Sequence, residues 1–194
     1  MGPQEFCLAV MALLFTPGPT NTLLALAGAG HGHHGGARHV LAELAGYMTL
    51  VLPLWWLGTA LLRAYPDFGT ALRIVAALWL AVIAARLWGA QRDAVVGKEI
   101  TPFAIFVTTM LNPKGLVFGL VLMPLVTFPP VTALAVLAGL ILTAGCTWFH
   151  LGRLVVKASG ALTAGQPVIR LLRRMAAVWL AIVSGGLAFS VIRG

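Results

Sequence analysis

The sequence predicts an all-α integral membrane protein with six transmembrane helices, built as two inverted three-helix repeats. Three observations lead to this prediction: the composition, the spacing of long apolar runs, and a proline-containing break in two of those runs. Of the 194 residues, 60% are hydrophobic and only 9% are charged, whereas a soluble domain carries about a quarter charged residues. The chain has too few charges to coat a globular surface, which excludes an ordinary soluble enzyme and a disordered or fibrous protein.

Six apolar runs are long enough to cross a bilayer as helices. A transmembrane helix needs about 20 apolar residues, and lone strands cannot satisfy their backbone polar groups in lipid. Because residues 1–6 lack the basic residues of a signal peptide, we expect the first run to be an uncleaved span. The predicted spans are at about residues 5–29, 38–62, 70–90, 102–128, 131–154 and 175–192. Residues 1–194 then form a single transmembrane domain, with repeat one at about 1–92 and repeat two at about 98–194.

The positive charges predict how the chain is oriented. Cytoplasmic loops carry an excess of Lys and Arg, so the net charge of +8 is expected to hold loops in place. It does not indicate nucleic-acid binding, since no aromatic platform accompanies the basic residues. With six spans, one side holds Arg63, Arg73 and Arg193, and the other holds Arg38, Arg86, Arg92, Lys98, Arg153, Lys157, Arg170, Arg173 and Arg174. The loops after spans one, three and five are therefore predicted to be cytoplasmic, with both termini outside.

Two of the spans contain a break near the middle. In span one, Pro17 and Pro19 flank Gly18, and in span four Pro113 follows Asn112. We call residues 16–19 the first break and residues 112–114 the second break. A proline inside a helix removes a backbone donor and clashes with the preceding turn. The freed backbone groups then need protein, water or a ligand as partners at that depth in the membrane.

The two breaks occupy matching places in the two halves of the chain. Leu111 lies 95 residues after Thr16, and the spans that follow the breaks start at similar offsets. Three spans followed by three spans in the opposite orientation form an inverted repeat. Discontinuous helices in corresponding positions point to the binding site of a transporter. The alternative is that both breaks are simple kinks in a structural bundle.

Two segments resemble the signatures of the lysine-exporter (LysE/RhtB) family of bacterial amino-acid efflux transporters. Thr16-Pro-Gly-Pro-Thr-Asn21 resembles the first signature, and Leu111-Asn-Pro-Lys-Gly115 resembles the second. The chain is also similar to other helices of the family at residues 38–46, 78–88 and 170–186. It differs in having Thr20 between the second proline and Asn21, and Trp79 where Tyr is usual.

The resemblance implies export of amino acids or close derivatives across the bacterial inner membrane, driven by protons through alternating access. Both termini are then periplasmic. The implied partners are an amino-acid substrate, protons and the lipid bilayer, with no cofactor and no enzymatic activity. Gly185 and Gly186 permit close helix contact, either within the bundle or between the two protomers of a homodimer.

Residues at the two breaks are the candidate substrate-binding residues. Freed backbone groups and short polar side chains can bind the head group of an amino acid. Lys114 is the cation deepest in the membrane and can hold a substrate carboxylate or pair with Glu43, although a lysine there can also snorkel along the helix. The predicted substrate-binding residues are Thr16, Pro17, Gly18, Pro19, Asn21, Asn112, Pro113 and Lys114.

Glu43 is the acidic residue that lies clearly inside a span, and it is the candidate for proton coupling. An ionisable residue in a membrane span is costly and is a functional candidate by default. His39, Glu43 and Tyr47 follow the spacing i, i+4, i+8 and so share one helix face. His150 on span five is the proposed proton partner of Glu43. The alternative is that Glu43 pairs with Arg38 or His39 near the inner headgroups.

A metal-cation exporter is the alternative function. His31, His33, His34 and His39 cluster around the first cytoplasmic loop, and His-rich tracts can bind metal ions. A metal pathway needs acidic or cysteine ligands within the spans, and these are scarce, so we predict no metal site. Because the two cysteines are unpaired and no nucleophile–base pair stands out, an enzyme is not predicted.

Overall fold

All regular structure in the described part of the chain is helical, as the sequence predicts. The computed structural model describes residues 1–30, 36–65, 67–89, 100–158 and 167–193. The elements are α1 (Pro3–Phe15), α2 (Pro19–Gly30), α3 (Gly36–Ala64), α4 (Phe68–Gly89), α5 (Pro102–Met110), α6 (Pro113–Val117), a π-helical segment η2 (Phe118–Leu122), a 3-10 turn η3 (Met123–Leu125), α7 (Pro130–Ala158) and α8 (Pro167–Arg193).

The apolar helices are compatible with a membrane protein. Over the described residues, two stretches are long and apolar enough to cross a membrane, Gly36–Gly58 in α3 and Pro130–Lys157 in α7. Two bent helix pairs raise this number to four if each pair is one span. The described parts of α4 and α8 contribute shorter apolar stretches, Ala77–Gly89 and Arg174–Gly186. The six-span arrangement therefore stays a prediction.

Both predicted breaks are present. The axes of α1 and α2 differ by 62°, and the axis of α5 differs by 48° from that of the helical segment Pro113–Leu125. At the first break, Thr16 leaves the helical conformation with φ −62° and ψ 126°. Pro19 and Pro113 each begin the helix that follows, where a proline is tolerated because the first backbone N–H of a helix lacks a partner.

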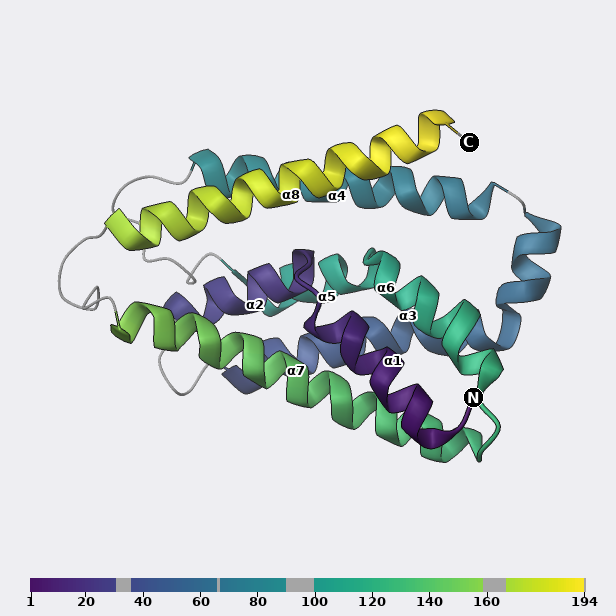
Figure 1. Ribbon diagram of the computed structural model, residues 1–194. Coiled ribbons are helices and arrows are strands. Elements are labelled where there is room, and N and C mark those ends of the chain that lie inside the picture. The colour runs from purple at the N-terminus through teal and green to yellow at the C-terminus, as the bar shows by residue number, and fades with distance from the viewer. Residues whose placement is uncertain (31–35, 66, 90–99, 159–166, 194) are drawn as a thin grey trace.

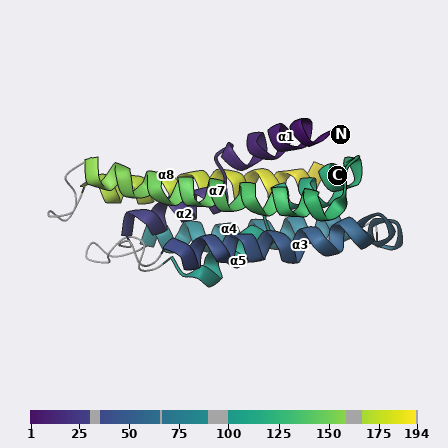
Figure 2. The ribbon, with the colours of Figure 1, turned by 90° about the horizontal axis from the view of Figure 1, so that it is seen from below.

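The broken helices pack on the long helices of the opposite half of the chain. The segment after the first break, α2, packs against α7, and the segment before the second break, α5, packs against α3. The long helices α3 and α7 contact each other, and α4 pairs with α8. Figure 1 shows α4 and α8 side by side along one edge of the bundle, with both chain termini at the same end. Seen from below, α3, α4 and α5 lie on one side and α7 and α8 on the other (Figure 2).

Two glycines let α2 and α7 approach each other closely. Gly28 of α2 lies against the backbone of Phe149, and Gly152 of α7 lies against the backbone of Ala25. A Cβ atom at either glycine would overlap a carbonyl group of the facing helix. Small residues at such contacts are a common way for membrane helices to pack. The pair fixes the segment after the first break against the other half of the chain.

Replacing Gly152 by Ala should destabilise the protein, because the added methyl group forces α2 and α7 apart. We expect the free energy of unfolding to fall by about 1–3 kcal/mol, the usual cost of overpacking. The matched control is Gly139→Ala in the same helix, where an added Cβ has no neighbour within 4 Å. Thermal unfolding of the purified protein in detergent measures both. Equal stability of the two variants would contradict the close α2–α7 contact.

Candidate functional site

At the first break, a buried asparagine donates hydrogen bonds to carbonyl groups that the interrupted helix leaves without their usual partners. Asn21 Nδ2 donates to the carbonyl oxygen of Leu14 at 2.7 Å and to that of Thr16 at 3.0 Å. Asn21 is buried, so these bonds are not exchanged for bonds to water. Trp148 Nε1 approaches the same Leu14 carbonyl at 3.4 Å. The carbonyl groups freed at this break therefore have donors from α2 and α7.

The second break is organised by another buried asparagine. Asn112 caps α6 by accepting a hydrogen bond from the backbone N–H of Lys114 at 3.1 Å. Its Nδ2 atom donates to Thr20 Oγ1 at 3.0 Å and lies 3.4 Å from the hydroxyl oxygen of Tyr47. Thr109 Oγ1 also donates to Thr20 Oγ1, at 3.3 Å. Asn112 thus ties the second break to α2 and to α3 at once.

A lysine from the second break also binds a backbone group of the first break. Lys114 Nζ donates to the carbonyl oxygen of Thr16 at 2.5 Å. Gly18 makes room for this side chain, because a Cβ there would lie 3.2 Å from Lys114 Nζ. Thr16 and Pro17 are exposed and Lys114 is half-buried. The two breaks therefore meet at one place, which is open on the side of Thr16 and Lys114.

Next to the breaks, the polar face predicted on α3 is buried. His39, Glu43 and Tyr47 are 3%, 1% and 0% exposed. Within the described part of the chain, Glu43 Oε2 has no hydrogen-bond partner. It lies against Gly145 of α7, where a Cβ atom would collide with it. The carboxyl group is thus enclosed between α3 and α7 with one oxygen unsatisfied.

The residues that the sequence suggested as partners of Glu43 either make other contacts or lie at the surface. The ammonium group of Lys114 binds the carbonyl oxygen of Thr16. His39 Nε2 lies 2.9 Å from the carbonyl oxygen of Ile100 and donates to it when that nitrogen carries the hydrogen. Arg38 is exposed at the start of α3.

The structure does not bring His150 to Glu43. His150 is exposed and lines a shallow pocket with Thr143, Cys146 and Thr147 on α7. At 100° per residue, His150 lies about 140° around the helix from Gly145, the residue that contacts Glu43. The predicted proton exchange between the two residues therefore lacks geometric support.

The other predicted substrate-binding residues lie at the two breaks. Gly18 and Pro19 are buried, and Pro113 is half-buried at the start of α6.

His31, His33 and His34 are outside the described residues. Among the residues that are described, no group of three or more His, Cys, Asp or Glu side chains could hold a metal ion.

Three residues of the site are not among the predicted site residues. Thr20 accepts hydrogen bonds from Asn112 and from Thr109, which joins the two breaks, and Gly145 leaves the space that Glu43 fills. The signal for Thr20 is present in the sequence, as the additional residue between Pro19 and Asn21. Thr109 and Gly145 carry no comparable signal, because their roles depend on which helices meet.

Comparison with known protein families, curated proteins and solved structures finds no match. The resemblance to the lysine-exporter family rests on the two proline motifs and on the similar stretches at residues 38–46, 78–88 and 170–186. Membership of this family stays a prediction, so a proposed function depends on the geometry of the two breaks.

Replacing Thr20 by Val should destabilise the protein, because Asn112 Nδ2 loses its nearer acceptor in a buried place. We expect a loss of about 1–3 kcal/mol in the free energy of unfolding. The control is Thr143→Val, which removes an exposed hydroxyl that bonds only to Gly139 within its own helix at 2.8 Å. Thermal unfolding in detergent measures both. A Thr20→Val protein as stable as the control would show that the bond between the breaks contributes nothing.

Proposed function

We propose that this protein is a secondary-active exporter of amino acids or close derivatives, coupled to protons and working by alternating access. The observation that supports it most is the junction of the two breaks. Broken helices that meet inside an apolar bundle offer backbone groups to a ligand at a depth where lipid offers none. The ammonium group of Lys114 and the buried carboxyl group of Glu43 also lie beside the junction.

The contact between Lys114 and Thr16 is suited to replacement by an amino acid. It joins an ammonium group to a backbone carbonyl oxygen. A zwitterionic amino acid carries the complementary pair, a carboxylate for Lys114 and an ammonium group for the Thr16 carbonyl. Binding would exchange one charge-assisted hydrogen bond for two, at the exposed side of the junction.

Glu43 supplies a reason for coupling to protons. An ionised carboxylate that is buried without a full set of partners is costly. The enclosed arrangement against Gly145 therefore favours the neutral form of Glu43, and the ionised form favours an arrangement that admits water or Lys114. Taking up or losing a proton then shifts the balance between two arrangements of the bundle. Tyr47, one turn along α3, contacts Asn112 at the second break and links this balance to the substrate site.

The packing of the helices supports an inverted repeat. Each broken span packs on the long helix of the other half, α2 on α7 and α5 on α3. The last helices of the two halves, α4 and α8, pair with each other. This exchange of partners is what a pseudo-two-fold axis between two three-helix units produces. Alternating access would then rock one unit against the other around the junction.

The test is transport by purified protein in sealed liposomes loaded with a mixture of amino acids, with efflux scored by mass spectrometry. We expect selective efflux that increases with an imposed pH gradient. Glu43→Gln should abolish the effect of the gradient while exchange of substrate continues. The matched control is Glu5→Gln, which changes an exposed carboxylate on α1. Gradient-driven efflux that survives in Glu43→Gln would refute the coupling role, and no movement of any amino acid by folded protein would refute the export function.

In the same liposomes, Lys114→Ala should raise the substrate concentration that gives half-maximal efflux by about tenfold or more, the value of a lost charge-assisted hydrogen bond. Lys157→Ala, which removes an exposed cation at the end of α7, is the control. An unchanged half-maximal concentration in Lys114→Ala would place the substrate carboxylate elsewhere.

A further inference from the structure

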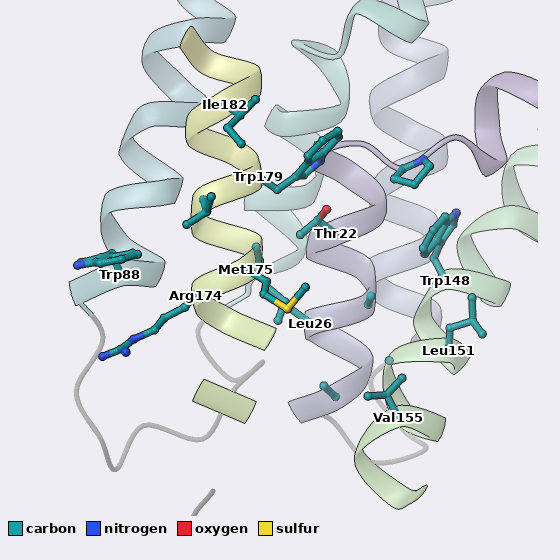
Figure 3. Close-up of a pocket in the computed structure, with 16 residues that line it drawn as sticks. Thr22, Leu26, Trp88, Trp148, Leu151, Val155, Arg174, Met175, Trp179 and Ile182 are labelled. Atoms are coloured by element: carbon teal, nitrogen blue, oxygen red, sulfur yellow. The ribbon is translucent and has the colours of Figure 1, made fainter. Parts of the chain in front are cut away.

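A large groove lies apart from the junction of the breaks. It has a volume of about 830 Å³ and opens between α2, α7 and α8, with Trp88 of α4 at one end. Figure 3 shows Met175 and Trp179 of α8 across from Leu26 and Thr22 of α2, with Leu151 of α7 at the right of the view. The size is that of a site for a small organic ligand, about 300–1,000 Å³.

The walls of the groove select an apolar ligand. Among the side chains that line the groove, Thr22 carries the hydroxyl group. This hydroxyl already donates to the Gly18 carbonyl at 2.9 Å. Arg174 at one end could bind the carboxylate of a zwitterionic amino acid, but no acidic side chain among the described residues lines the groove to bind its ammonium group. Several lining side chains, Met175 and Ile182 among them, are exposed, so the groove opens towards the space that lipid would fill.

The groove has the length of one membrane leaflet. Its lining residues on α8 run from Arg174 to Ile182, which is about 12 Å at 1.5 Å per residue. Half of a hydrocarbon core of about 30 Å is about 15 Å. Pro17, at the first break, also lines it. A chain entering from the membrane surface would therefore reach the break near the middle of the bilayer.

The charge at one end of the groove fits an anionic group. Arg174 lines this end, and its guanidinium carbon lies 5.9 Å from the centre of the Trp88 ring. Residues 101–194 contain no Asp or Glu, yet five cations fall between residues 153 and 174. Basic pockets between helices at a cytoplasmic surface are suited to acidic lipid headgroups.

We propose that this groove binds an anionic phospholipid, with its acyl chains against α2, α7 and α8 and its headgroup at Arg174. The proposal does not depend on transport; it needs only that the helices lie in a bilayer. A second copy of the chain is a poorer occupant, because two copies in one membrane share an orientation. Their basic ends would then face each other at the same depth and repel.

The test is native mass spectrometry of the purified full-length protein in detergent, with dioleoyl phosphatidylglycerol or dioleoyl phosphatidylcholine added. We expect phosphatidylglycerol to be retained more strongly. Arg174→Gln should weaken its binding about fivefold, as expected for one basic residue at a membrane surface, and leave phosphatidylcholine unchanged. Arg86→Gln removes an exposed cation of α4 that does not line the groove, and it should have no effect.

A second pair of variants tests the groove itself. Val178→Trp puts an indole ring into the groove, so the variant should lose both lipids. Because Val178 is half exposed, the variant should still fold. Val82→Trp adds the same ring on the exposed surface of α4, outside the groove, and should lose neither. Equal retention of the two lipids by the unaltered protein, or equal effects of Arg174→Gln and Arg86→Gln, would overturn the proposal. A lipid-free dimer that Val178→Trp disrupts would overturn it in favour of a second copy.

Discussion

Backbone groups released by proline in an apolar bundle must find new partners, and the rest of the site depends on how this chain provides them. The carbonyl oxygens of Leu14 and Thr16 lose their helical partners at the first break and accept from Asn21. The Thr16 carbonyl also accepts from Lys114, which comes from the second break. Because part of the repair comes from the other half of the chain, satisfying the backbone also fixes where the halves meet. The location of a polar junction inside the bundle follows from this requirement.

Glycines determine how closely α7 approaches α2 and α3 near that junction. The contacts of Gly28 and Gly152 bring α2 and α7 together at backbone distance, and the same helix α7 offers Gly145 to the carboxyl group of Glu43. A larger residue at position 145 would push Glu43 out of the enclosure or push α3 away from α7. The close approach of α7 therefore both holds the first break in place and keeps Glu43 out of water, so the two properties cannot be changed independently.

The sequence predicts what local rules decide. The two proline motifs predicted where both breaks lie, and the i, i+4, i+8 spacing predicted that His39, Glu43 and Tyr47 share one face of α3. In the structure this face is buried. The same kind of reasoning does not identify the neighbours of His150, because spacing defines a helix face but not the helix that it will meet. It also missed Thr109 and the bond between Asn112 and Thr20, which joins residues 92 apart in sequence. Contacts of that kind depend on how the helices dock, and docking is set by many small packing terms.

For the exporter that we propose, the strength of the junction is as informative as its geometry. The open side has Thr16 and Lys114, while the closed side is held by the bonds that Thr20 accepts from Asn112 and Thr109. Neutral hydrogen bonds contribute about 0.5–1.5 kcal/mol each in net terms, so breaking these two bonds costs a few kcal/mol at most. A barrier of that size lies within what binding an amino acid and moving one proton can supply. In the proposed exporter, these bonds would help to hold the junction closed at rest and would still be weak enough to break in each cycle.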